Sequence, residues 1–333
     1  MTKFSILDLA PVPQGCRPGD ALRNTLDLAR HADQLGYTRY WLAEHHNMVG
    51  IASAATAVVI GQVAAVTQRI RVGAGGVMLP NHSPMVIAEQ FGTLEELFPG
   101  RIDLGLGRAP GTDQRTLQAL RVNPAAAEHF PDDVLELQSF LAPEAAGQTL
   151  RAVPGFGTNV PLWILGSSLY GSQLAAHFGF PYAFASHFAP DALMQALQVY
   201  RQRFRPSQQL QRSYAAAGVN VFAAETDAEA QRLFTSAQQR AVHMVRNDRG
   251  YLPPPIDDIE SYWSPMEKMQ VGRMLACSFV GARETVRRGL EKFIADTGVD
   301  EVIVATAIFD HEARKRSYAI LDDVTQSLGR AAA

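Results

Sequence analysis

Short runs of apolar and β-branched residues alternate with longer stretches of helical periodicity along this chain of 333 residues. The run at residues 4–9 is followed by a segment in which Leu22, Leu26 and Ala29 recur at helical spacing. Gly36 is placed to end that helix, because glycine readily adopts the left-handed conformation of a helix terminus. This alternation predicts repeated β-α units and therefore a mostly parallel sheet.

The same alternation continues along the rest of the chain. We expect strands at residues 4–9, 38–43, 70–74, 102–106, 161–165, 182–185, 216–224 and 301–305. We expect helices at residues 20–35, 52–67, 132–141, 169–178, 190–204 and 227–245, and one opened by Ser83 and Pro84. A short hairpin is expected near residues 150–156.

No linker rich in glycine or serine divides the chain, so we expect a single domain over residues 1–333. The predicted fold class is α/β, as a (β/α)8 TIM barrel with insertions at the C-terminal face. A doubly wound sheet is the alternative, but it leaves unexplained why so many units continue without a boundary. Residues 247–265 form an irregular stretch longer than ordinary β-α loops, which we interpret as a candidate active-site lid.

Composition narrows the kinds of partner. The formal net charge of −3 provides no cationic field for nucleic acid or an anionic membrane surface. The longest apolar stretches fall short of the roughly 20 residues that span a bilayer, and the N-terminus lacks the apolar region of a secretion signal. Cys16 and Cys277 are too few for a disulfide framework or a zinc cluster, so we expect a cytoplasmic protein without a metal site.

In a barrel of this kind the active site is expected where the strands end. The second strand is followed directly by a cluster of proton-transfer groups, Glu44, His45, His46 and Asn47. Adjacent side chains of an extended segment point to opposite sides, so only one of the two histidines is expected to reach the cavity. A solvated loop is the alternative. A metal site is disfavoured, because the Glu-His-His step lacks the spacing of known zinc motifs.

Small residues follow the third strand, where Gly75 and Gly76 are adjacent. A glycine pair lets the backbone take unusual dihedral angles or lets a flat ligand approach closely. A turn or bulge without a ligand explains the pair equally well.

Two further segments could together hold one phosphate group. Arg108 follows the fourth strand, and the turn after the fifth strand contains Ser167, Ser168, Gly171 and Ser172. Backbone N–H groups and hydroxyls at a helix N-terminus bind anions, and a guanidinium adds bidentate charge. Taken alone, the two adjacent serines are more typical of helix caps.

The chain closely resembles the bacterial-luciferase-like flavin monooxygenases in four segments, which match in order and spacing. These segments are YWLAEHH (residues 40–46), VGAGGVMLPNHSP (72–84), AEQ (88–90) and PGRIDLGLGR (99–108). More narrowly, residues 41–113 and 165–191 resemble luciferase-like proteins of the YhbW type.

The resemblance implies a (β/α)8 barrel, a homodimer packed through helices near the second and third units, and reduced FMN supplied by a separate flavin reductase. His45 matches the active-site histidine of luciferase, and Gly75 and Gly76 match a non-proline cis peptide beside the isoalloxazine ring. Arg108 matches the phosphate-binding arginine. The family's second phosphate-binding segment matches Ser167, Ser168, Gly171 and Ser172.

The implied reaction is monooxygenation of an aldehyde, ketone or related small organic substrate. Reduced FMN would react with dioxygen at its C4a carbon, giving a peroxyflavin that a closed lid protects from water. Light emission is not expected, because Gly107 stands where luciferase has a reactive cysteine and residues 247–265 do not resemble the luciferase mobile loop. An F420-dependent hydride-transfer oxidoreductase and a non-catalytic flavin-binding protein are the alternatives, and a metal-dependent hydrolase is the least favoured.

Overall fold

The computed structural model describes residues 2–108, 113–123, 125–144 and 148–331. Its strands are β1 (Lys3–Asp8), β2 (Arg39–Leu42), β3 (Arg71–Met78), β4 (Ile102–Gly107), β5 (Leu162–Gly166), β6 (Tyr182–Phe184), β7 (Ala215–Ala223), β8 (Ser278–Gly281) and β9 (Glu301–Ala305). Its α-helices are α1 (Pro18–Leu35), α2 (Thr56–Val66), α3 (Pro84–Leu97), α4 (Gln114–Ala119), α5 (Phe130–Leu141), α6 (Leu169–Phe178), α7 (Leu193–Arg203), α8 (Asp227–Val245), α9 (Pro265–Met274), α10 (Arg283–Thr297) and α11 (His311–Ala331). Short 3-10 turns are η1 (Leu79–Asn81) and η2 (Ala126–Glu128).

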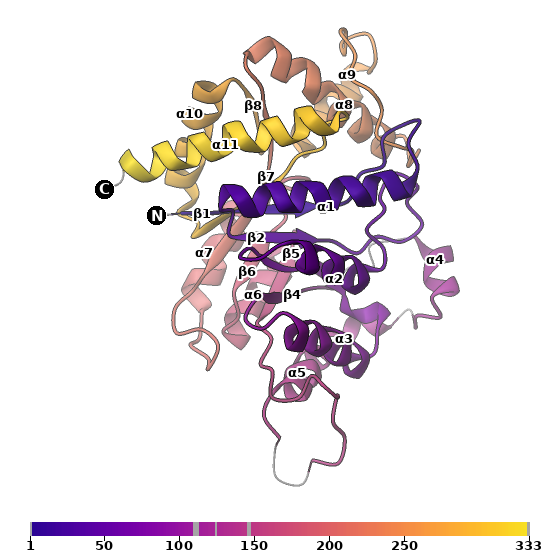
Figure 1. The fold of residues 1–333 in the computed structure, drawn as a ribbon, viewed down its shortest axis with the longest axis vertical. Helices are drawn as coiled ribbons and strands as arrows, with labels where there is room; N and C mark the ends of the chain where they lie inside the picture. The colour runs from indigo at the N-terminus through magenta and orange to yellow at the C-terminus, as the bar shows by residue number, and fades with distance from the viewer. Residues whose placement is uncertain (1, 109–112, 124, 145–147, 332–333) are drawn as a thin grey trace.

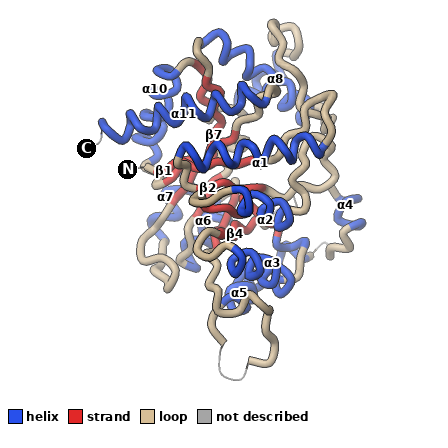
Figure 2. The backbone as a smooth tube through the Cα atoms, viewed as in Figure 1, coloured by secondary structure: helices blue, strands red, loops and turns tan. Residues whose placement is uncertain are grey.

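Eight strands close into a parallel barrel. Their order around the ring is β6, β5, β4, β3, β2, β1, β9 and β7, and β7 pairs in turn with β6. Parallel pairing requires a crossover between successive strands, which the helices provide. Figure 2 shows the strands at the centre with helices around them. The eight barrel strands are the ones that the sequence predicts, so the (β/α)8 barrel class is confirmed. The single domain over residues 1–333 stays a prediction.

The insertion between β7 and β9 is more regular than the sequence predicts. β7 pairs with β6 through residues 215–217 and with β8 farther along, through residues 220–223. The insertion contains α8, α9, β8 and α10, which lie at the upper end of Figure 1. The hydrophobic pattern did not reveal β8, because this strand has four residues and most of them are only half-buried.

Two local expectations are corrected. The hairpin near residues 150–156 is wrong, because residues 148–161 form turns and contain no strand. Pro154 cannot donate to a strand ladder, and Gly155 instead packs so closely on α3 that a Cβ atom on Gly92 would lie 2.0 Å from its Cα. The helix expected from residue 52 begins at Thr56, because Ala52 donates a backbone hydrogen bond to the loop after β1.

Two apolar clusters pack on the barrel strands, one on the outer side and one on the inner side. The larger lies between the strands and the helices. The smaller fills the barrel interior and contains Leu7, Trp41, Ala43, Trp163, Ala183, Ala216 and Ile303. Within it the rings of Trp41 and Trp163 meet edge to face with centroids 4.9 Å apart. We call these two rings the aromatic floor, because they close the interior below the strand ends. Among the described residues, no helix is long and apolar enough to cross a membrane.

Candidate active site

Glu44 leaves the end of β2 toward the outside of the barrel. Its buried carboxylate accepts a hydrogen bond from the backbone N–H of Met78 at 2.9 Å. The Nε2 atoms of His82 and His46 lie 2.9 and 2.7 Å from its oxygens. Burial alone would raise the pKa of Glu44, but these partners outweigh it and hold the pKa below its ordinary value. Glu44 therefore stays ionised and fixes the loop after β3 to the loop after β2.

His45 points to the opposite side, as the alternation of an extended segment predicts. Its backbone N–H donates to the carbonyl of Ser53 at 3.0 Å, and its Nδ1 atom is buried without a hydrogen-bond partner. Burial lowers the pKa of His45 to about 4, and the guanidinium of Arg240 acts in the same direction. The imidazole is therefore neutral at pH 7 and able to accept a proton.

The glycine pair lies within β3, with Gly75 next to Trp41 of the aromatic floor. The peptide bond between Gly75 and Gly76 is cis, as the resemblance implies. A Cβ atom on Gly75 would lie 3.0 Å from both Leu7 Cδ1 and Trp41 Cε3. On Gly76 it would lie 2.6 Å from the carbonyl oxygen of Gly105. Only glycine fits at these two positions without displacing its neighbours.

Arg108 and the start of α6 lie together at the ends of β4 and β5. The guanidinium carbon of Arg108 is 4.1 Å from the ring centroid of Tyr170, in the first turn of α6. Ser168 is the N-cap residue, and its side chain makes no capping hydrogen bond. Ser167 and Ser168 are exposed, and the first-turn N–H groups of a helix have no intrahelical acceptor. The arrangement combines a cation, two hydroxyls and free backbone donors.

Gly171 and Ser172 lie in the same segment but are packed inward. A Cβ atom on Gly171 would lie 3.3 Å from the ring of Tyr182 and 3.4 Å from Gly166 Cα. Ser172 is buried, and its hydroxyl donates to the carbonyl of Leu169 at 2.8 Å. These two residues hold α6 close to β5 and so position the helix N-terminus beside Arg108.

His187, in the turn after β6, also belongs to this end of the barrel. The sequence pattern does not distinguish it from the other histidines. A Cβ atom on Gly218 of β7 would lie 2.4 Å from its Nδ1 atom, so the ring lies directly over this glycine. Its Nδ1 atom has no partner, and burial, then His45 and Arg240, lower its pKa to about 4. We call the region around His45, His187 and Gly218 the barrel mouth.

Arg240 of α8 is a second residue that sequence reasoning missed. It is half-buried and makes no hydrogen bond or ion pair with the part of the chain that the structure describes. Burial and the nearby charge of Arg314 lower its pKa. The sequence offered one signal, the small residues Ser236, Ala237 and Ala241 around it, which the structure buries.

The candidate lid at residues 247–265 lies between α8 and the loop after β1. Leu252 is buried, donates to the carbonyl of Val12 at 2.9 Å and accepts from the N–H of Gln14 at 2.8 Å. The amide of Gln239 on α8 donates to the carbonyl of Pro254 at 2.8 Å. The segment is thus held next to the barrel mouth on two sides. Its action as a lid stays a prediction.

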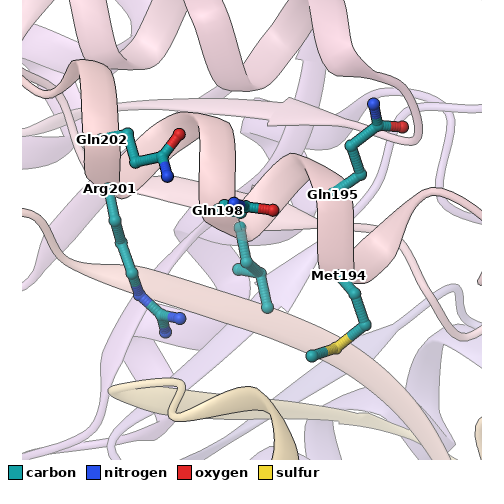
Figure 3. Close-up of a pocket in the computed structure, with 6 residues that line it drawn as sticks. Met194, Gln195, Gln198, Arg201 and Gln202 are labelled. Carbon is teal, nitrogen blue, oxygen red and sulfur yellow. The ribbon is translucent and has the colours of Figure 1, made fainter.

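Two other places in the described ranges carry polar side chains close together. In the described ranges, Asp27, His311 and Glu312 lie close enough to hold a metal ion, but they are on the outside of α1 and α11, where Lys315 pairs with both carboxylates. Figure 3 shows a hollow on the outside of α7, lined by Met194, Gln195, Leu197, Gln198, Arg201 and Gln202. Its amides and its single cation offer no acid–base pair. The barrel mouth is therefore the candidate active site.

The profile of a protein family described as luciferase-like monooxygenase matches residues 2–301. This range contains all eight barrel strands apart from the last four residues of β9. The chain therefore belongs to the luciferase-like monooxygenase family.

Within that family, the chain is 53% identical to a luciferase-like monooxygenase of Escherichia coli (strain K12) over 326 residues, which is 98% of this chain and 97% of that protein. It is 50% identical over 324 residues to the uncharacterized protein YvbT of Bacillus subtilis (strain 168), covering 97% of this chain and 96% of YvbT. The crystal structure of apo-MsnO8 superposes with a TM-score of 0.87 at 34% identity, covering 98% of this chain and 99% of that chain.

Proposed function

We propose that this protein is a two-component monooxygenase that uses reduced FMN and dioxygen to oxidise an aldehyde, ketone or related small organic substrate. The observation that carries the proposal is the neutral His45 at the barrel mouth of a luciferase-like chain, close to a flat glycine backbone. Bound reduced FMN would supply the electrons with which one oxygen atom of dioxygen enters the substrate and the other leaves as water.

The residues at the strand ends fit this cofactor. Arg108, the hydroxyls of Ser167 and Ser168 and the first-turn N–H groups of α6 would hold the phosphate. The backbone of Gly75 and Gly76 would lie against the flat ring, since neither residue has a side chain of its own. Gly171 and Ser172 would contribute by fixing the position of α6.

His45 would take or share a proton at the substrate. Its imidazole is neutral because burial and Arg240 lower its pKa to about 4, so it can act as a base at pH 7. The segment at residues 247–265 would exclude water once the substrate is bound. His45→Ala should abolish substrate oxidation while leaving the affinity for reduced FMN unchanged. Loss of FMN affinity with normal turnover would contradict this role.

The first test is a titration of the purified protein with oxidised FMN, chemically reduced FMN and F420. We expect tighter binding of reduced FMN than of the other two. Arg108→Gln should weaken that binding about 10- to 100-fold, because a charged hydrogen bond contributes about 1.5–3 kcal/mol. The exposed Arg115→Gln on α4 serves as the matched control and should bind normally. Selective binding of F420 would assign the protein to hydride transfer, and no flavin binding at all would reject the cofactor assignment.

The partners of the reaction are part of the same proposal. A separate reductase would supply reduced FMN, and a second copy of the chain would pack on α2 and α3. Support for the homodimer comes from large apolar side chains exposed on these helices, Val58 at 69% and Leu97 at 64%. We expect Leu97→Glu to shift the sedimentation equilibrium from dimer to monomer. The free thiols of Cys16 and Cys277 support a reducing, cytoplasmic environment.

A further inference from the structure

In the described ranges, several buried polar atoms of the barrel mouth and of α8 have no hydrogen-bond partner. They include His45 Nδ1, Ser53 Oγ, His187 Nδ1, Ser236 Oγ and His243 Nδ1. Proteins leave few buried polar atoms without a partner, because each one costs its desolvation free energy. Two of them, the Nδ1 atoms of His45 and His187, belong to the barrel mouth, where a ligand or ordered water would complete their hydrogen bonding.

Arg240 brings a positive charge to the same place. It lies one helical turn after Ser236, so both side chains leave the same face of α8. Its charge acts on the imidazoles of both His45 and His187. The nearby charge that acts on Arg240 itself is another cation, Arg314, and no carboxylate of the described chain raises its pKa.

The buried carboxylates of Asp8 and Glu44 already have partners. Asp8 accepts hydrogen bonds from Arg314 at 2.7 Å and from Thr25 at 2.7 Å. Glu44 is held by His82 and His46, on the outer side of β2. Arg240 therefore remains the uncompensated charge of this part of the structure, and an anion from outside the chain would complete it.

The two imidazoles can add hydrogen bonds without adding charge. Their pKa values of about 4 keep both rings neutral at pH 7. A neutral imidazole that carries its proton on Nδ1 donates one hydrogen bond from that atom. Asn220 donates to the backbone carbonyl of His187 at 2.6 Å, which fixes the turn that carries this ring above Gly218.

This group is separate from the proposed phosphate site. Arg108 and the start of α6 follow β4 and β5, whereas α8 follows β7, which lies on the other side of β6 from β5 around the ring. One anion cannot contact both arginines unless it spans the barrel mouth. The anion at Arg240 is therefore a different group from the phosphate assigned to Arg108.

We propose that Arg240, with His45 and His187 beside it, binds a carboxylate of the organic substrate. A guanidinium binds a carboxylate through two parallel hydrogen bonds, and the imidazoles would complete its coordination. The substrates are then small organic acids that carry an oxidisable group elsewhere in the molecule. This inference rests on the proposed function, because it names the substrate class of the same site.

The test compares hexanoate with hexanamide, which have the same length and differ in charge. Binding to the flavin-free protein is measured by calorimetry and by the fluorescence of its three tryptophans. We expect hexanoate to bind at least about tenfold more tightly, as one charged hydrogen bond provides. Arg240→Gln should bring the two affinities within about twofold of each other, since the remaining neutral contacts do not discriminate charge. The control Arg30→Gln, exposed on α1, should keep the preference.

Three results would overturn the proposal. One is equal binding of the two probes by the wild-type protein, and another is an unchanged preference in Arg240→Gln. The third is a lower thermal midpoint in Arg240→Gln, which would assign the arginine a structural role. We expect the midpoint to stay the same or rise, because the substitution removes an unpaired, partly buried charge.

A second arm separates this inference from the proposed function. Reduced FMN is titrated into wild type and Arg240→Gln, and we expect equal affinities. A loss of FMN affinity in the variant, without a hexanoate preference in the wild type, would show that Arg240 binds the flavin. That result would overturn the proposal. If the protein binds no flavin but prefers hexanoate, the monooxygenase assignment fails while the carboxylate site stands.

Discussion

At the scale of single residues, two histidines from different strand ends share one environment. His45 follows β2 and His187 follows β6, yet burial near Arg240 lowers the pKa of each to about 4. Each ring also leaves Nδ1 unpartnered. The barrel thus keeps two neutral imidazoles next to the guanidinium of Arg240. Neutral rings can exchange protons and donate hydrogen bonds to an anion, whereas protonated rings would add two positive charges beside Arg240.

This environment predicts a pH dependence of stability. The unfolded chain binds more protons than the folded one between the ordinary histidine pKa of 6.5 and the folded value of about 4. The free energy of unfolding therefore has its full value above pH 6.5. It decreases as the pH is lowered from 6.5 to about 4, by at most about 1.4 kcal/mol per pH unit for each histidine. Replacing both His45 and His187 by Gln should make the thermal midpoint less dependent on pH in this range. An unchanged slope would show that other groups cause it.

Gly218 tests the position of His187. A side chain on Gly218 would meet His187 Nδ1 at 2.4 Å, so Gly218→Ala must displace the imidazole. We expect the free energy of unfolding in urea to fall by about 1–3 kcal/mol, the usual cost of overpacking. Adding His187→Ala should recover most of that loss, because the clashing ring is gone. A double variant that is no more stable than Gly218→Ala would place the clash elsewhere.

At the scale of elements, the helices that follow β5 and β7 bring different groups to the barrel mouth. α6 presents its N-terminus, because Gly171 lets it pack closely on β5. α8 instead presents a side face, on which Ser236 and Arg240 lie one turn apart. Its neighbouring face is bonded to the candidate lid through Gln239 and Thr235.

Thr235→Val should loosen the segment at residues 247–265. The hydroxyl of Thr235 accepts from the N–H of Ile256 at 2.9 Å, and valine has the same shape without the acceptor. A net hydrogen bond contributes about 1 kcal/mol, so we expect about fivefold faster hydrogen exchange of the Ile256 amide. Thr93→Val, exposed on α3, is the matched control and should leave that exchange rate unchanged. Exchange that is equal in both variants would mean that this contact does not hold the segment.

At the scale of the whole molecule, an ion network joins distant strands beneath the aromatic floor. Arg39 of β2 lies 2.6 Å from Asp103 of β4 and 3.0 Å from Glu301 of β9. Its guanidinium also lies over the ring of Trp163 of β5, 4.8 Å from the centroid. One side chain thus connects four strands of the barrel and lies between two buried carboxylates.

Arg39→Met should destabilise the fold by about 3–5 kcal/mol, because it leaves two buried carboxylates with fewer partners. The free energy of unfolding in urea measures this loss. The control is Arg273→Gln, which removes an exposed pair with Asp191 and should cost at most about 1 kcal/mol. Equal losses in the two variants would mean that burial does not determine the strength of this network.

The sequence by itself determined the barrel strands and the residues that stand at their ends. Alternating apolar runs and helix signals are local, so the eight strands, the expectation that only one of His45 and His46 reaches the cavity, and the glycine pair followed from neighbouring residues. The residues themselves indicated an anion site at Arg108 and the start of α6, and the family resemblance implied a phosphate at the same place. The hairpin near residues 150–156 failed because the long-range packing of Gly155 on α3 outweighed local turn signals.

Only the tertiary structure decided which charged groups are compensated. Arg240 looks like any helical arginine in the sequence, and His187 looks like any turn histidine. Whether such a group has a partner depends on side chains from many separate segments. No local sequence pattern contains these long-range contacts. The same holds for β8, whose pairing needs the part of β7 that extends past β6. The chain's local patterns fix the scaffold, while the contacts between distant segments determine which groups remain free to bind a ligand.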